Sequence, residues 1–522
     1  MMAAETLVKF YSKAQKFMRE SGDVTGRVGF DGIQGVPSPN HGGNIPRLME
    51  SLELLNVYNY ANTFQLRMLG DFCPENSLCG AWYGTYSDSH VLAENTKEYC
   101  QAIPYVSLFN GLRATWFWVM ATPGTISGYA PDLTSLPFFQ ARTDSLKEIR
   151  TGIADLVLDA EKQRDPILVL HSDRSRIADA LYPIDGNNGR AFRYVNSINS
   201  IETALEDSGY SFRYITEKQL PSLKDAKVLI MPCTLSVSDA DAEQILAFAK
   251  NGGIVISDIV PGELDSHGAK RGKSPFADVF PSEQGKKAYG KGCFVNTGKL
   301  LIKYNKTRET HISWEKRMPL AGLAFGKLLQ EVSGIAPRIK LASADGKQFP
   351  PTTRFGWKKG NVSLIGLIRD NYLYDFKPYR LNLILPESGH VYDVRAKKYL
   401  GKADNITFTQ DYHAMLFAVM PSRITGYKVT VPSSVKVADK VKVSAMIQVT
   451  DGAVPNHAAC RLTVKNPAGQ TCKEFEQTFT VRDGKVSAEL SLAFNQMPGK
   501  YTVTVMDTVS GAVGSAQFEV VK

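Results

Sequence analysis

Several signatures of common chemistries are missing from this 522-residue sequence. No two of its seven cysteines form a Cys-x-x-Cys pair, and an odd number cannot all pair within one chain. A disulfide framework is therefore not expected. The eight histidines show no metal-ligand spacing, and no glycine-rich phosphate loop stands at a strand–helix junction. The sequence predicts neither a metal nor another cofactor.

The sequence also lacks a long apolar run that could span a membrane. Its first twenty residues carry apolar side chains at helical spacing with lysines between them, unlike the uninterrupted apolar core of a signal peptide. We predict no membrane partner. The compartment stays open: extracellular or periplasmic if a longer form carries an export signal, and cytoplasmic otherwise.

Excess charge of one sign is small, with a formal net charge of +9. Part of it is local, because six lysines and arginines fall in the Gly-rich stretch 270–291. Such a stretch could attract phosphates or acidic polysaccharide, but a solvated basic loop is the simpler interpretation. Nucleic acid is not a predicted partner.

The chain is too long for one hydrophobic core, so several domains are expected. Residues 1–162 alternate helix and strand patterns, which favours a parallel sheet or a barrel. A Ser-x-x-Glu capping box at Ser145 and Glu148 predicts a last helix that runs towards residue 162. The four predicted strands lie near residues 27–30, 56–61, 79–84 and 113–120.

The remaining residues divide into three further predicted domains. Residues 163–338 form a second α/β domain of the doubly wound, flavodoxin-like type, with Ser238 as the N-cap of one helix. Beyond residue 340 the hydrophobic period changes to two. We predict a small β-sandwich over residues 339–425 and an Ig-like β-sandwich over residues 426–522. The predicted fold class is therefore α/β followed by all-β.

One segment of the second domain carries a family resemblance. The pairs Met231–Pro232, Ser238–Asp239 and Gly252–Gly253 stand where family 42 glycoside hydrolases, of the β-galactosidase type, have similar residues in their amidotransferase-like trimerisation domain. Residues 102–120 also look like the helix and last strand of the catalytic barrel of that family. The resemblance covers roughly residues 20–420. The last hundred residues resemble only a generic Ig-like module.

The resemblance implies that residues 1–162 are the C-terminal half of a (β/α)8 barrel, strands five to eight. It also implies an O-glycosyl hydrolase, an oligo- or polysaccharide partner and a homotrimer formed through the second domain. The stretch from Cys79 to His90 is then strand seven, but it has no match to the nucleophilic glutamate of the family. Two hypotheses stay open: a β-galactosidase-like enzyme that lacks the first half of its barrel, and a non-catalytic carbohydrate-binding or scaffold protein.

Two aspartates are the candidate catalytic residues, because most glycoside hydrolysis requires a pair of carboxyl groups. Asp88, just beyond the third strand, could replace the missing glutamate. Asp31, after the first strand, would lie on the same catalytic face. The structural alternatives are a helix cap for Asp88 and a turn residue for Asp31.

The candidate substrate-binding residues are aromatic or lie in a glycine-rich loop. Aromatic faces suit the C–H faces of sugar rings. Trp116 and Trp118 share one side of their strand, so they could instead fill the barrel interior. The loop that holds His41 and Asn44 could equally be an ordinary surface loop. The full set is Trp82, Tyr83, Tyr86, Trp116, Trp118, His41 and Asn44.

Cys233 is a weak candidate, although true amidotransferases use a cysteine nucleophile. Such a cysteine stands on a Gly-x-Cys-x-Gly elbow between a strand and a helix, whereas the glycines are missing from the sequence around Cys233. We do not expect this thiol to be a nucleophile.

Overall fold

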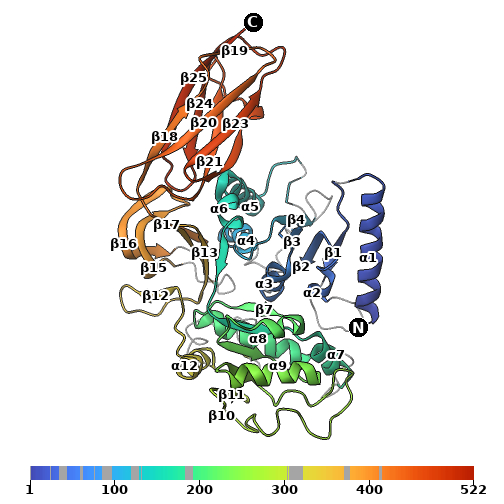
Figure 1. The fold of residues 1–522 in the computed structure, drawn as a ribbon. Helices are drawn as coiled ribbons and strands as arrows, with labels where there is room; N and C mark the ends of the chain where they lie inside the picture. Colours follow the sequence, from blue (N-terminus) through green and yellow to red (C-terminus); the bar gives the residue numbers. More distant parts are fainter. Residues whose placement is uncertain are drawn as a thin grey trace.

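The computed structural model describes residues 2–23, 25–33, 44–58, 63–75, 77–84, 97–118, 128–130, 132–182, 192–301, 304, 321–369, 377–410 and 414–522. Its strands form four sheets (Figure 1). We call them the first sheet (β1–β4), the second sheet (β6–β11), the third sheet (β12–β17 with β5) and the fourth sheet (β18–β25). The chain is therefore mixed α/β in its first part and all-β in its last.

The first sheet has four parallel strands in chain order. Because a parallel connection needs a crossover, helices separate the strands. Leu55, Val57, Cys79 and Ala81 are fully buried on one face of this sheet, in a core that includes residues of these helices. The elements are α1 (Met2–Glu20), β1 (Gly29–Ile33), α2 (Ile45–Leu48), β2 (Leu54–Tyr58), α3 (Thr63–Phe72), β3 (Leu78–Gly84), α4 (Lys97–Phe109), β4 (Ala114–Trp118) and α5 (Pro137–Glu148).

The helix that follows the first sheet begins earlier than the capping box at Ser145 predicts. α5 starts at Pro137, whose fixed φ angle suits the first helical position. Ser145 lies buried in the last part of α5, so it does not cap a helix, and this prediction was wrong. A π-turn at Ile149–Ile153 leads to α6 (Ala154–Leu158).

The boundary predicted at residue 162 falls inside a strand. β5 (Glu161–Gln163) pairs with β13 (Thr352–Lys359) at the edge of the third sheet. The segment between the first and second sheets therefore contributes to a sheet formed mostly by residues about two hundred positions later in the chain.

The second sheet has the strand order β10-β11-β9-β8-β6-β7, parallel except for the β10–β11 pair. This is the order of flavodoxin-like sheets with one added edge strand, and the order reverses between β6 and β8. The Ser238 hydroxyl accepts the Asp241 amide at 3.1 Å, which confirms the predicted N-cap. The elements are β6 (Ile167–Leu170), α7 (Asp173–Leu181), α8 (Phe192–Asp207), β7 (Arg213–Ile215), η3 (Glu217–Ser222), β8 (Val228–Met231), α9 (Asp239–Lys250), β9 (Ile254–Ser257), β10 (Gly285–Tyr289), β11 (Gly292–Asn296) and α12 (Ala321–Ser333).

The third and fourth sheets are antiparallel apart from the β19–β25 pair. Buried and exposed residues alternate along β20, the period-two pattern expected of a half-buried strand. The third sheet adds β12 (Lys340–Ser343), β14 (Val362–Arg369), β15 (Tyr379–Asp393), β16 (Lys398–Gln410) and β17 (Met415–Met420). The fourth contains β18 (Ile424–Thr430), β19 (Ser434–Lys436), β20 (Lys440–Val449), β21 (His457–Lys465), β22 (Gln477–Arg482), β23 (Lys485–Ser491), β24 (Gly499–Asp507) and β25 (Val513–Val521).

Two apolar cores cross the borders between the sheets. One joins helices around the first sheet to the second sheet, and the other joins α4 and α6 to the third and fourth sheets. Figure 1 shows α4, α5 and α6 between the first sheet and the β-rich end of the molecule. Among the described helices, none combines the length and the apolar character needed to cross a membrane.

Candidate carbohydrate-binding site

Aromatic residues lie side by side at the C-terminal ends of the first-sheet strands. Tyr58 of β2 pairs with Trp82 of β3, and Trp82 pairs with Trp116 of β4. Two residues further along each strand, Gly84 pairs with Trp118. The register therefore places the backbone positions of two predicted sugar platforms, Trp82 and Trp116, next to each other, although they are 34 positions apart in the sequence.

The two faces of β4 have different surroundings. The Phe117 ring packs against the Phe139 ring of α5, with 5.5 Å between centroids, and the Arg142 guanidinium lies 5.7 Å from the Phe117 centroid. Phe117 thus faces the helices, and Trp116, the preceding residue, faces the opposite side of the sheet. Trp116 is half-buried there.

A glycine makes room for the Trp116 ring. A Cβ atom on Gly80 would lie 2.2 Å from the Trp116 ring, so the indole covers the backbone of β3 at this position. Any larger residue at position 80 would displace the ring. The platform is therefore shaped by two neighbouring strands together, and a half-buried indole on the face opposite Phe117 can accept the apolar face of a sugar.

The candidate carboxylates are described only in part. Asp31 lies within β1, where the register shifts between Phe30 and Ile33 in a bulge-like irregularity. It is the single acidic residue in the sequences of the four strands of the first sheet. Asp88, Tyr86 and His41 lie outside the described residues, as do the side chains of Asp31, Trp82, Tyr83 and Trp118.

Asn44 has a structural contact at the start of α2. Its side-chain oxygen accepts the Arg47 amide at 3.0 Å, as an N-cap residue does. The Asn44 side chain also lies close enough to the Asp173 carboxylate, at the start of α7, to lower the pKa of that carboxyl. Burial disfavours the ionised Asp173, but Arg176, His171 and Asn44 together lower the pKa of its carboxyl. Asn44 therefore links the first sheet to the second.

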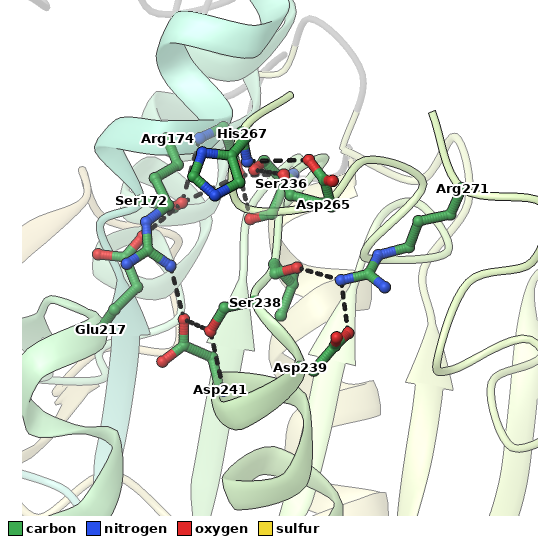
Figure 2. A network of polar contacts seen from close by, with 12 residues as sticks. Ser172, Arg174, Glu217, Ser236, Ser238, Asp239, Asp241, Asp265, His267 and Arg271 are labelled. Carbon is green, nitrogen blue, oxygen red and sulfur yellow. Dashed lines mark hydrogen bonds and ion pairs between the residues drawn. The ribbon is translucent and has the colours of Figure 1, made fainter. Parts of the chain in front are cut away.

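A polar network crosses the C-terminal edge of the second sheet (Figure 2). Ser172 donates to Glu217 at 2.8 Å, and Arg174 pairs with Asp241 at 2.7 Å. Figure 2 shows Arg271 reaching over the start of α9, where it pairs with Asp239 at 2.7 Å. The acidic and guanidinium groups of this network are thus paired or hydrogen-bonded. The network therefore holds the loop around residue 271 on α9 and does not present a free charge.

Cys233 has the backbone of a strained elbow, which its sequence context does not reveal. It follows β8 directly and has φ of 37°, a conformation that is uncommon without glycine. Its amide donates to the Asp258 carboxylate at 2.8 Å. Burial, with the charge of Asp258, raises the pKa of the thiol well above its usual value. A protonated, buried thiol is a poor nucleophile.

No cluster of three or more His, Cys, Asp or Glu side chains suited to a metal occurs within the described residues. At the C-terminal ends of the first-sheet strands, the structure describes the indole of Trp116 and the backbone position of Asp31.

Comparison with known proteins gives structural matches but no sequence family. No family model and no curated protein matches the chain. A β-galactosidase from Bacillus circulans sp. alkalophilus matches over 80% of this chain and 66% of its own, with a TM-score of 0.58 and 12% identity. The β-galactosidase of the haloarchaeon Halorubrum lacusprofundi matches over 79% and 66%, with a TM-score of 0.51 and 11% identity.

A catalytic mutant of Gan42B, a GH42 β-galactosidase from G. stearothermophilus, matches over 72% of this chain and 60% of its own, with a TM-score of 0.50 and 12% identity. The chain thus spans less than two thirds of the length of these relatives, between 60% and 66%. At such low identity the likeness shows the fold alone: the chain has a GH42-like fold.

Proposed function

We propose that this chain is a glycoside-hydrolase-related protein of the β-galactosidase type, and that the first sheet is its sugar-binding site. One observation carries the proposal: Trp82 and Trp116 are register partners at the C-terminal ends of parallel strands. In barrels built from parallel strands, substrates bind at this end. The GH42-like fold is consistent with a galactoside or a related oligo- or polysaccharide as the ligand.

In the enzymatic form of this proposal, the first sheet is the second half of a (β/α)8 barrel within residues 1–162. Residues 163–338 are its amidotransferase-like domain, and two β-sandwich domains follow at 339–425 and 426–522. Asp88 and Asp31 would supply the two carboxyl groups that glycoside hydrolysis needs. Tyr83, Tyr86, Trp118, His41 and Asn44 would surround the sugar.

The alternative is a non-catalytic carbohydrate-binding or scaffold protein. It is favoured by the sequences of the four strands, in which Asp31 is the single carboxylate and no glutamate occurs. The aromatic platform serves equally well in both forms, because stacking on a sugar does not depend on a carboxylate pair.

The test measures binding and hydrolysis separately. Titration calorimetry with galactose-containing oligosaccharides should show binding that is lost in Trp116→Ala. Phe117→Ala is the matched control: it removes a neighbouring ring of β4 that faces the helices, so binding should persist. Equal binding by both variants, or none by the parent chain, would contradict the sugar-binding site.

Hydrolysis of a panel of nitrophenyl glycosides then separates enzyme from binding protein. Turnover that disappears in Asp88→Asn supports the enzymatic form. Oligosaccharide binding without turnover supports the scaffold form.

We also propose a homotrimer formed through residues 163–338, on the same family resemblance. Light scattering coupled to gel filtration should give three times the chain mass, and a monomeric mass would contradict the trimer.

A further inference from the structure

A small cationic cavity lies where the first, second and third sheets meet. Its volume is about 20 Å³, which exceeds the roughly 10–15 Å³ that one water molecule needs. A space of this size holds one small particle. The lining comes from α3, from the end of α4, from β5 and from β13, and it includes Arg67, Phe109, Lys162, Arg164, Ser211 and Arg354.

Two of these cations are already paired. Arg67 of α3 is 6% exposed and donates to Glu206 of α8 at 2.6 Å. Its guanidinium also lies 4.5 Å from the centroid of the Phe212 ring. Arg164 pairs with Asp71. These two pairs neutralise half of the positive charge around the cavity.

The other two cations contact only carbonyl groups. The Lys162 ammonium donates to the carbonyl oxygens of Gly70 at 3.1 Å and Asn110 at 2.7 Å. Arg354 donates to the carbonyl of Ile339 at 2.9 Å. Among the described side chains, no carboxylate lies within ion-pair distance of either cation. Asp71 acts on Lys162 and Asp165 acts on Arg354, but neither forms an ion pair with its cation. Two positive charges therefore line one cavity without a direct ion-pair partner, an arrangement that is costly in a protein interior.

Two guanidinium N–H groups at the cavity are also unsatisfied. The Nε atoms of Arg67 and Arg354 are buried, and neither has a hydrogen-bond partner within the part of the chain that the structure describes. Buried donors are nearly always paired in folded proteins. Two such donors on residues that line one cavity, one from helix α3 and one from strand β13, favour a shared acceptor.

Two glycines lie next to the cationic side chains of the cavity. A Cβ atom on Gly111, which has φ of +88°, would lie 2.6 Å from the Lys162 ammonium. A Cβ atom on Gly209 would lie 2.0 Å from Nη1 of Arg354. Both glycines thus leave room for the charged ends of these two side chains.

We propose that this cavity is a binding site for one monatomic anion of the size of chloride, held by Arg67, Lys162 and Arg354. The anion supplies the missing negative charge and accepts the two unsatisfied N–H groups. Because the three side chains belong to α3, β5 and β13, the bound anion joins the first sheet to the third.

The charge of Lys162 sets the conditions for the test. Burial lowers the pKa of Lys162 to about 7; nearby Arg164 and Arg67 lower it further, whereas Asp71 and Cys73 oppose the shift. Burial also lowers the pKa of Arg354, to about 10, so this guanidinium stays charged. Both groups are cationic at pH 6, where an anion should bind best.

The experiment compares thermal unfolding of the full chain at pH 6 in sodium chloride and in sodium methanesulfonate at equal ionic strength. Methanesulfonate is much larger than chloride and serves as the comparison anion. We expect chloride to raise the midpoint of the parent chain by about 2 °C or more. Lys162→Met and Arg354→Gln should each remove at least half of this difference. Equal midpoints of the parent in the two salts would overturn the proposal.

Lys359→Met is the matched control. The Lys359 ammonium donates to a backbone carbonyl, as Lys162 does, but it is also paired with the Asp159 carboxylate at 2.7 Å. The chloride effect should persist in this variant. An effect that changes equally in all three variants would overturn the proposal.

Crystallography with bromide tests the site directly, even if a variant fails to fold. Crystals of the parent chain in sodium bromide should show an anomalous peak within hydrogen-bond distance of the Nε atoms of Arg67 and Arg354. Ordinary density without an anomalous signal would identify a water molecule and overturn the anion site.

Discussion

The buried ion pair between Arg67 of α3 and Glu206 of α8 should be a main determinant of how the first and second sheets unfold together. The two side chains are 6% and 2% exposed, and their charged atoms are 2.6 Å apart. Burial alone would lower the pKa of Arg67, but Glu206, Glu202 and Asp71 raise it above its usual value. The guanidinium is therefore firmly charged, and removal of one partner leaves the other charge buried.

This burial sets the loss of stability that we expect when one partner of the ion pair is removed. Arg67→Met should lower the free energy of unfolding by about 3–5 kcal/mol, because Glu206 loses its cation in a buried environment. About 1 kcal/mol of this loss comes from the contact of the guanidinium with the Phe212 ring. Glu206→Leu should cost a similar amount. The double variant with Arg67→Met and Glu206→Leu should recover most of the loss, since a matched apolar pair can replace a buried ion pair.

Urea unfolding, with hydrogen exchange of α3 and α8 as the local measure, tests this reasoning. The matched control is Arg47→Met, which breaks a half-exposed pair with Glu5 and should cost less than about 1 kcal/mol. If Arg67→Met costs no more than Arg47→Met, the buried pair does not join the two sheets. If the double variant loses the sum of both single losses, the two charges do not interact.

Three further predictions concern single residues. Burial lowers the pKa of Lys162 to about 7, below the unfolded value of 10.5, so the unfolded chain binds more protons between pH 7 and 10. In chloride-free buffer, the free energy of unfolding of the parent, measured in urea, should therefore rise relative to that of Lys162→Met by up to about 1.4 kcal/mol per pH unit. A difference between the two chains that does not change with pH would contradict this prediction. Gly152→Ala, with φ of +115° and a Cβ position 2.3 Å from Thr508, should lose more stability in urea than Gly22→Ala, which has φ of +86° but no atom within 4 Å. Iodoacetamide should add one group to the native chain, at half-buried Cys73, since the other six thiols are buried; mass spectrometry of Cys73→Ser should then show none.

Local patterns predicted the elements of the first sheet but not their ends. The strand expected at residues 113–120 is β4 at Ala114–Trp118, and the strand expected at 27–30 is β1 at Gly29–Ile33. Strand ends depend on where the partner strand stops pairing, which composition does not encode. The Ser238 cap was predictable because its hydrogen bond spans three residues.

The capping box at Ser145 shows the opposite case. The motif is local, but burial of Phe139 and Ser145 in one continuous helix places Ser145 away from any helix start. A tertiary contact thus overrides a valid local signal. The same limit hid the cationic cavity, because Arg67, Lys162 and Arg354 come from three distant segments with no recurring spacing.

The two faces of β4 illustrate how far the candidate site could be predicted. Alternation along a strand requires that Trp116 and Phe117 face opposite sides, whatever the fold. It cannot say which of the two meets the helices, because both residues are aromatic and both are half-buried. The contact of Phe117 with Phe139 of α5 decides the question, and Phe139 lies 22 positions further along the chain. The contact of Phe117 with α5 therefore identifies the opposite face of β4, the face of Trp116, as the one that can present a sugar platform.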